Sequence, residues 1–222
     1  FAKDFEIPCV GGKVSLYNET SDGPIKPTPV IGVIGLIDKK PLKIQKINSG
    51  DSLIMVGDTK DELGGSEYSE YIHKFIGGKC PAVDFSESKK NMNCGLDIIE
   101  KELIKSAHDC SKGGLTIAIS ELCMINQIGC NVSLEKIPGE KLDSDKILFS
   151  ESHSRYLLTI ENKNLSKLEE TLKKYGVSYS LIGEFTGDSI CFSSDSKPII
   201  DLSVDKAQKT WFNSLKEMVL HA

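Results

Sequence analysis

The residues Gly11-Gly12-Lys13-Val14-Ser15 are the first in this chain whose types and spacing suit anion binding. Adjacent glycines let backbone N–H groups approach a phosphate closely, and the Ser15 hydroxyl adds another donor. The Lys13 ammonium could neutralise phosphate charge directly. A glycine pair by itself is more typical of an ordinary turn, so these residues alone leave both interpretations open.

A second segment, Ser106–Leu115, joins a predicted strand end to a glycine loop and a helix start. His108 and Asp109 lie at the strand end, and Gly113-Gly114 opens the helix. A helix amino terminus reached through glycines is a favourable anion site. His108 could serve as a general acid or base, but a buried histidine bonded to the backbone is the more common arrangement.

A third segment is acidic, with four carboxylates between Asp58 and Glu67. Such a cluster could hold a metal ion. We favour a simpler account, in which Asp61 and Glu62 stabilise a helix amino terminus. The pair Gly64-Gly65 then allows a tight loop.

The fourth segment, Phe149–Arg155, contains the only arginine among the 27 basic residues. A guanidinium is the better bidentate clamp for phosphate, so Arg155 is a candidate phosphate contact. An ion pair with Glu151, four residues earlier, or another buried ion pair is an equally good explanation.

Taken together, the four segments resemble phosphoribosylformylglycinamidine synthase of the small type, in its carboxy-terminal part. Residues 11–20 are similar to the family signature Gly-Asn-Val-Ser-Leu-Tyr-Asn-Glu. The resemblance implies that Gly12 contacts ATP and that Ser15 contacts the ribonucleotide substrate. The family's asparagine, a magnesium ligand, is Lys13 here. An ammonium has no lone pair for Mg²⁺, so no metal ligand is expected in this chain, and Lys13 is a candidate phosphate contact instead.

The other three segments extend the resemblance. Residues 62–68 are similar to the family's Glu-Leu-Gly-Gly-Ser-Glu-Tyr, and residues 150–155 to its Ser-Glu-Ser-x-Ser-Arg. Residues 108–115 are similar to a motif of the whole aminoimidazole-ribonucleotide-synthetase-like superfamily, with Lys112 in place of an acidic residue. The resemblance implies an auxiliary nucleotide site. Its candidate residues are His108, Asp109, Gly113 and Gly114.

The implied reaction converts formylglycinamide ribonucleotide, ATP and glutamine-derived ammonia to formylglycinamidine ribonucleotide, ADP and phosphate. ATP and Mg²⁺ are the implied cofactors. The implied partners are an amino-terminal part of the same enzyme, a glutaminase subunit and a small bridging subunit. Catalytic residues are expected on sequence preceding residue 1, so none is assigned here, and this chain is expected to be inactive alone.

Three alternatives stay open at this point. One is another enzyme of the superfamily, such as a selenophosphate synthetase or a hydrogenase-maturation factor, although its own motifs would then replace Val14–Glu19. Another is a nucleotide-binding module without turnover. The last is a scaffold that only supports the other half of the enzyme and binds no nucleotide.

The elements that would position these residues follow from hydrophobic periodicity. The apolar run 29–37 is typical of a strand buried on both faces, and the helix at 114–127 is apolar nearly all round. Further strands are predicted at 51–57, before His108, and at 155–160, 178–185 and 188–193. Further helices are predicted at 92–105, at 165–175 up to Gly176, and from Val204 with Ser203 as N-cap.

This alternation predicts an α+β fold, a mixed sheet packed with helices. The resemblance makes that fold aminoimidazole-ribonucleotide-synthetase-like and divides the chain into residues 1–44, the tail of a second α/β domain, and residues 45–222. A net charge of −5 in 222 residues excludes a basic footprint for nucleic acid or an anionic membrane. No apolar run of membrane-spanning length occurs. Seven cysteines without close pairing predict free thiols and a cytoplasmic protein.

Overall fold

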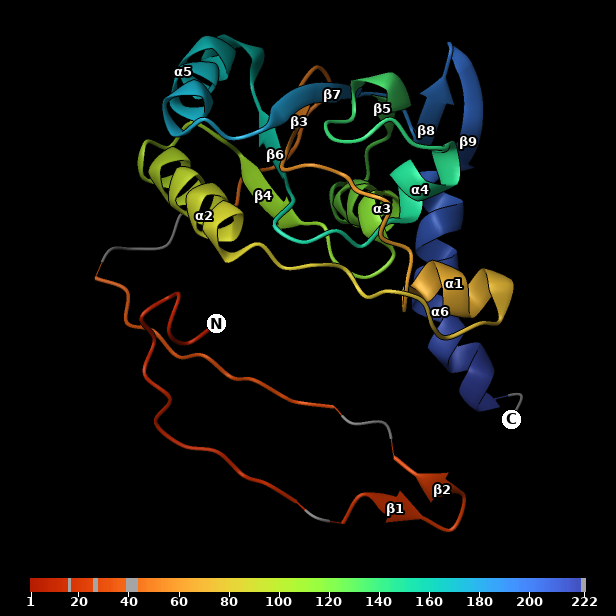
Figure 1. The fold of residues 1–222 in the computed structure, drawn as a ribbon. Coiled ribbons are helices and arrows are strands. Elements are labelled where there is room, and N and C mark those ends of the chain that lie inside the picture. Colours follow the sequence, from red (N-terminus) through yellow and green to blue (C-terminus); the bar gives the residue numbers. More distant parts are fainter. Residues whose placement is uncertain (16, 26–27, 39–43, 221–222) are drawn as a thin grey trace. The chain divides into compact units, whose positions relative to one another are not determined.

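The computed structural model describes residues 1–15, 17–25, 28–38 and 44–220. Contacts divide the chain into two compact units, Phe1–Lys43 and Ile44–Ala222, which are drawn in Figure 1. Each unit is described by itself. The assignment of residues 1–44 to the tail of a larger domain stays a prediction.

The first unit contains a short hairpin, in which β1 (Glu19–Thr20) pairs antiparallel with β2 (Gly23–Pro24). The strand predicted at 29–37 is wrong, because these residues form no strand here and Ile34 and Leu36 are each 98% exposed. A strand needs a neighbour for its hydrogen bonds and a surface against which to bury its side chains. The described residues of this unit provide the apolar run with neither.

The second unit is built on one sheet of seven strands in the order β4-β6-β3-β7-β5-β8-β9. Its neighbours are antiparallel except for β5 and β8, which run parallel, so the predicted mixed sheet is confirmed. The strands are β3 (Ser52–Val56), β4 (Ser106–Asp109), β5 (Cys130–Ser133), β6 (Tyr156–Ile160), β7 (Tyr179–Phe185), β8 (Ser189–Ser194) and β9 (Lys197–Ser203).

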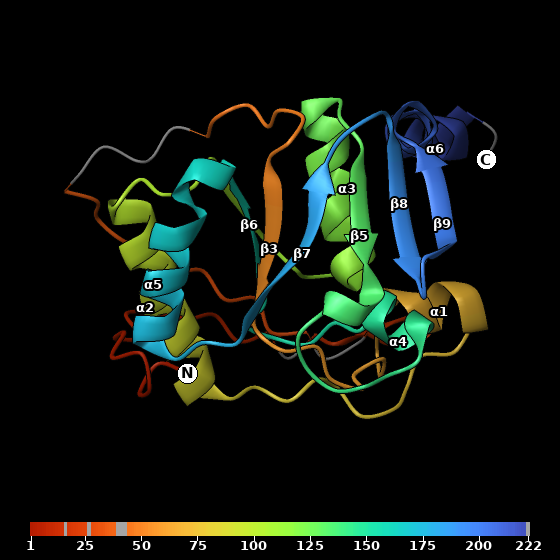
Figure 2. The same cartoon turned by 90° about the horizontal axis from the view of Figure 1, so that it is seen from above.

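Six helices accompany this sheet: α1 (Glu67–His73), α2 (Phe85–Glu100), α3 (Gly114–Asn126), α4 (Ser144–Phe149), α5 (Leu165–Tyr175) and α6 (Val204–Leu220). Strand β3 is buried throughout, and its side chains alternate between faces. Leu53 and Met55 belong to the core that includes α3. Helices α2 and α5 contact one another and lie side by side in both views (Figures 1 and 2). No described helix combines the length and apolar character of a membrane span.

Helix α2 begins and ends earlier than the predicted 92–105. The Asp84 side chain accepts from the Glu87 N–H at 2.9 Å and caps the helix at Phe85. Its buried positions are Asn91, Cys94 and Ile98, whereas Leu96 is 54% exposed. The prediction followed the aliphatic residues and missed a core face that contains a cysteine and an asparagine.

The other helix predictions fare better. Helix α3 is buried along most of its length, although Ile125 is 75% exposed. Helix α5 ends where predicted, with Gly176 in the left-handed conformation. Ser203 Oγ accepts from the Lys206 N–H at 3.3 Å, which confirms the N-cap of α6. The face of α6 that carries Trp211 is exposed in the second half of the helix, where Trp211, Leu215 and Met218 are 53%, 69% and 69% exposed.

Candidate functional site

Three of the four sequence motifs meet at one end of the sheet in the second unit. The backbone of the acidic loop after β3 runs beside the segment before β6. The Lys60 N–H donates to Ser152 Oγ at 3.1 Å, and the Glu62 N–H donates to Ser150 Oγ at 3.3 Å. In return, the Glu151 N–H donates to the Glu62 carbonyl at 3.1 Å. The two serines that flank Glu151 therefore fix its backbone on both sides.

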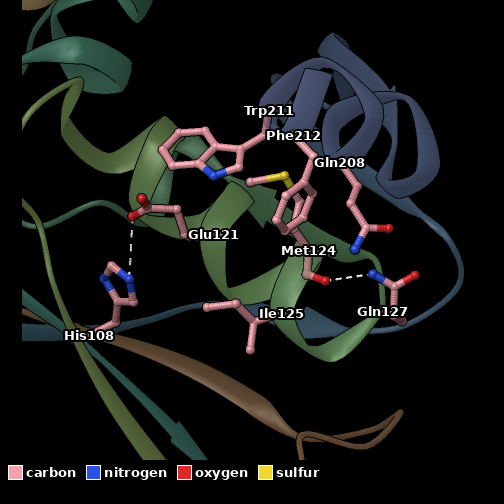
Figure 3. A pocket seen from close by; sticks show the side chains of 8 residues that line it. All are labelled: His108, Glu121, Met124, Ile125, Gln127, Gln208, Trp211 and Phe212. Carbon is pink, nitrogen blue, oxygen red and sulfur yellow. Dashed lines mark hydrogen bonds and ion pairs between the residues drawn. The ribbon is translucent and has the colours of Figure 1, made fainter. Parts of the chain in front are cut away.

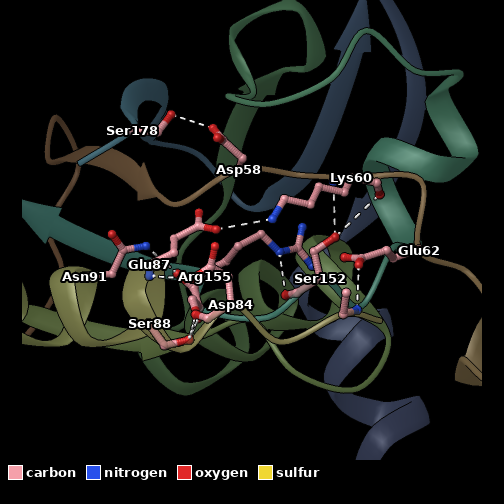
Figure 4. Close-up of polar contacts among 12 residues, drawn as sticks. Asp58, Lys60, Glu62, Asp84, Glu87, Ser88, Asn91, Ser152, Arg155 and Ser178 are labelled. Atoms are coloured by element: carbon pink, nitrogen blue, oxygen red, sulfur yellow. Dashed lines mark hydrogen bonds and ion pairs between the residues drawn. The ribbon is translucent and has the colours of Figure 1, made fainter. Parts of the chain in front are cut away.

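Arg155 is buried beneath this junction, with only 3% of its surface exposed, and it bonds to both segments. Its Nε donates to the Ser152 carbonyl at 2.9 Å, Nη1 donates to Thr59 Oγ1 at 3.0 Å, and Nη2 donates to the Ser150 carbonyl (Figure 4). Burial lowers the pKa of Arg155, and the charges of nearby carboxylates, Glu62 among them, act against that shift. These bonds give Arg155 a structural task that does not need a ligand. Its role as a phosphate contact stays a prediction.

Glu151 is the residue that the sequence analysis treated only as a partner of Arg155. One of its carboxylate oxygens, Oε1, accepts from the Glu67 N–H at 2.9 Å and from the Gly113 N–H at 2.9 Å. Glu67 is the first residue of α1, and Gly113 is the N-cap of α3. The carboxylate therefore joins the amino-terminal ends of two helices.

The glycine pair predicted to open an anion site does open α3. Gly113 and Gly114 have φ angles of 75° and 65°, which only glycine adopts without strain. A Cβ atom on Gly114 would lie 2.6 Å from the Ser150 carbonyl oxygen, so the chain before Glu151 packs directly on this glycine. The helix end predicted to attract an anion thus faces a carboxylate of its own chain.

His108 lies apart from the contacts of Gly113 in a groove of about 400 Å³ between α3 and α6 (Figure 3). Its Nδ1 is 2.7 Å from the Asp109 carbonyl oxygen, and its Nε2 is 3.3 Å from Glu121 Oε2. The backbone contact agrees with the arrangement that the sequence favoured, but His108 is half-buried and not buried as expected. Trp211 from α6 also lines this groove. The proposed auxiliary-site roles of His108 and Asp109 stay predictions.

The acidic residues of the loop after β3 have separate partners. Lys146 pairs with Asp61. Ser178 donates to Asp58, and Lys60 Nζ lies 3.2 Å from Glu87 Oε2 (Figure 4). Burial acts to lower the pKa of Lys60, but the hydrogen bond and charge of Glu87 outweigh it and raise that pKa. Within the described part of the chain, no group of three or more histidines, cysteines or carboxylates could hold a metal ion.

Helix α1 starts later than the acidic residues suggested. Ser66, not Asp61 or Glu62, is its N-cap, and Ser66 Oγ accepts from the Ser69 N–H at 3.2 Å. The Glu62 carboxylate instead accepts from the Ala82 N–H at 2.8 Å. The expected helix position is therefore wrong, and the non-metal role of these carboxylates stays a prediction.

The glycine-lysine-serine motif lies in the first unit. Lys13 and Ser15 line one hollow of about 540 Å³, together with Asn18 and Thr28. All four side chains are exposed. Leu16, within the same motif, lies outside the described residues. The proposed contacts of Gly12 with ATP and of Ser15 with substrate stay predictions.

Comparison with known proteins identifies the family. Residues 48–193 match the family model described as AIR synthase related protein, C-terminal domain, which covers more than half of the chain. The chain belongs to the AIR synthase related family. Within this family it is similar to phosphoribosylformylglycinamidine synthase subunit PurL of Methanocaldococcus jannaschii and of Thermococcus sibiricus. Each relative is 37% identical over 98% of this chain. The resemblance drawn from the four motifs is confirmed.

The chain spans about 30% of the length of these two relatives. Solved structures of Thermotoga maritima PurL share its fold. The complex with FGAR has a TM-score of 0.67 at 19% identity, covering 74% of this chain and 29% of that one. The complex with ATP has a TM-score of 0.60 at 20% identity, covering 74% and 26%. The likeness confirms the aminoimidazole-ribonucleotide-synthetase-like α+β fold.

Proposed function

We propose that this chain forms the carboxy-terminal part of a PurL-type phosphoribosylformylglycinamidine synthase. With the remaining part of the enzyme it would convert formylglycinamide ribonucleotide, ATP and ammonia to formylglycinamidine ribonucleotide, ADP and phosphate. ATP would phosphorylate the amide oxygen, and ammonia would then displace phosphate from the iminophosphate. A closed site that excludes water would protect this intermediate.

One observation supports the proposal above the others: 37% identity to PurL subunits over 98% of the chain. The four motifs are spread along the whole sequence and occur in the family's order. A superfamily enzyme of different chemistry would replace Val14–Glu19 with its own motif, so the PurL assignment is favoured over that alternative.

Within this proposal, Gly12 contacts ATP, Ser15 contacts the ribonucleotide, and Lys13 and Arg155 are candidate phosphate contacts. The exposure of Lys13 and Ser15 supports their role, whereas the burial of Arg155 favours a structural one. Lysine at position 13 does not fit a magnesium ligand. Mg²⁺ is therefore proposed as the counterion of ATP without a ligand from this chain.

The proposed partners are the amino-terminal part of the synthetase, a glutaminase subunit and a small bridging subunit. A structure titled as PurLQS of Thermotoga maritima is among the solved structures similar to this chain, with a TM-score of 0.59. We place the enzyme in the cytoplasm, in keeping with purine biosynthesis and free thiols. An auxiliary nucleotide at Gly113 and Gly114 would require Glu151 to move, as argued below.

The test is ammonia-dependent ADP formation with formylglycinamide ribonucleotide and Mg²⁺. The chain is assayed alone and mixed with the amino-terminal part of a related PurL, as wild type and as Ser15→Ala. We expect no turnover by the chain alone, turnover by the mixture, and a loss of about tenfold or more with the substitution. Removing one hydrogen bond to a bound, charged substrate has an effect of this size.

Thr20→Ala is the matched control. Among the described residues, the bonds of Thr20 Oγ1 stay within its own hairpin: it donates to the Gly23 carbonyl at 3.2 Å and accepts from the Asp22 N–H at 3.3 Å. It should leave turnover by the mixture unchanged. A mixture without activity, or turnover by the chain alone, would contradict the proposal. Equal loss with both variants would remove the substrate contact from Ser15.

A further inference from the structure

The carboxylate of Glu151 occupies the place where an anionic ligand would bind α3. The first N–H groups of a helix have no intrahelical acceptor, and the helix dipole favours negative charge there. At the amino-terminal end of α3, the acceptor is Glu151 Oε1, which accepts from the Gly113 N–H at 2.9 Å. Gly113 has no side chain that could cap the helix. Glu151 therefore supplies from within the chain the anion that this helix end attracts.

The same oxygen also accepts from the first amide of α1, the Glu67 N–H at 2.9 Å. Helix α1 has no buried residues, so few other contacts hold it. Among them, the rings of Tyr68 and Phe149 stack at 4.6 Å, and Lys112 Nζ lies 2.7 Å from Glu67 Oε1 at the surface. One carboxylate thus carries a large share of the attachment of α1 to the start of α3.

Hydrogen bonds on both sides of Glu151 fix the backbone that carries its carboxylate. Ser150 Oγ and Ser152 Oγ accept from the loop after β3, and Arg155 donates to the carbonyls of both serines. The Ser150 carbonyl lies within 2.6 Å of where a Cβ of Gly114 would be. The space in front of the glycine pair is therefore taken by Glu151 and the residue before it.

We propose that Glu151 is a built-in anion that joins α1 to α3 and keeps phosphate-bearing ligands away from Gly113. A ligand phosphate could reach this amide only by displacing Glu151, and α1 would then lose one of its main attachments. The proposal bears on the auxiliary site alone and does not depend on the proposed reaction. Its readouts involve no turnover, so its failure is distinguishable from a failure of the proposed function.

The experiment compares the full chain as wild type and as Glu151→Gln. Glutamine keeps the shape and one acceptor oxygen but removes the charge. A charged acceptor makes a hydrogen bond roughly twice as strong as a neutral one, so the Glu67 and Gly113 amides should exchange with solvent about fivefold faster in the variant. Inorganic pyrophosphate should bind Glu151→Gln about tenfold more tightly than wild type, because the competing charge is gone.

Glu151→Asp separates the charge from the packing. The shorter side chain keeps its charge but reaches both amides poorly, so exchange should again be faster while pyrophosphate binding stays as weak as in wild type. Glu170→Gln, an exposed position on α5, is the control and should change neither quantity.

Equal pyrophosphate affinity of wild type and Glu151→Gln, including no binding by either, would overturn the proposal. Protection of the Gly113 amide by pyrophosphate in the wild type, at the affinity of the variant, would do the same. Tighter binding by Glu151→Asp as well would show that packing, not charge, closes the site, and would also overturn it.

Discussion

At the scale of single residues, the cysteines of this chain differ in how far their thiols are exposed to solvent. Cys9 and Cys80 are exposed, whereas Cys94, Cys110, Cys123 and Cys130 are buried. Burial raises the pKa of Cys110 to about 11, because the thiolate would have to form without water. The nearby Arg155 guanidinium acts in the opposite direction and does not prevent this rise.

Alkylation at pH 8 should therefore modify Cys9 and Cys80 first and leave Cys110 unmodified in the folded protein. The thiolate is the reactive form, and the raised pKa keeps Cys110 protonated well above this pH. Peptide mapping by mass spectrometry after a short iodoacetamide pulse measures the order. In urea all seven thiols should react. Early labelling of Cys110 under native conditions would contradict its burial.

Glu151 and Arg155 show which part of the site can be predicted from residues. Both residues lie in a motif that the sequence singled out. The segment around them does contact the acidic loop after β3 and the glycine segment that opens α3. The sequence could not show that Glu151 bonds to Glu67 and Gly113, which lie 84 and 38 residues away. Periodicity reports local structure, and contacts of this range depend on how elements pack. The paired serines around Glu151 were the one available signal.

At the scale of elements, a buried ion pair fixes the start of β3 to the strand that follows α2. Lys105 and Asp51 are 5% and 4% exposed, and Lys105 Nζ lies 2.9 Å and 2.7 Å from the two carboxylate oxygens of Asp51. Burial acts to lower the pKa of Lys105, but the hydrogen bonds and charges of Asp51 and Glu161 together outweigh it and raise that pKa. The contribution of Lys105 to stability is therefore present at neutral pH and is lost as the pH rises through its folded-state pKa.

Replacing Lys105 with methionine should lower the free energy of unfolding by about 3–5 kcal/mol, because Asp51 is left buried without its counter-charge. Urea denaturation at pH 7 measures this change. The double variant Lys105→Met with Asp51→Asn should recover a large part of the loss, since no unpaired charge remains. A single variant as stable as wild type would show that Asp51 reaches water or another partner.

Element prediction succeeded where local signals and burial agree. Helix α5 has a leucine face and a terminal glycine, and its predicted bounds, 165–175, match those of the structure. The run 29–37 has the composition of a buried strand but no pairing partner among the described residues. Helix α1 was expected to start at Asp61 and Glu62 but begins at Glu67. Strands β5 and β9 were not predicted, since their polar residues interrupt the apolar pattern. Whether such segments form a helix or a strand depends on tertiary contacts, which cannot be read from composition.

At the scale of the whole molecule, the described core residues, from Ile47 to Val204, all belong to the second unit. We expect residues 44–222 alone to unfold in one cooperative transition. The free energy of unfolding should lie within about 1 kcal/mol of the full chain, because every core residue that the structure describes lies in the second unit. Urea denaturation of both forms, followed by circular dichroism, gives the comparison. A loss of several kcal/mol would show that the first 43 residues stabilise the second unit.

The order of strands in the sheet has a consequence for synthesis on the ribosome. Strand β3 is wholly buried, and both of its neighbours come late, since Val56 pairs with Tyr156 on one side and Tyr179 on the other. A ribosome adds about 5–20 residues per second, so β3 waits roughly 5–20 s before its first neighbour exists. During that interval its apolar residues and open backbone edges are exposed on a nascent chain. A chaperone that binds exposed apolar segments of nascent chains should therefore raise the yield of folded protein above that of translation without the chaperone.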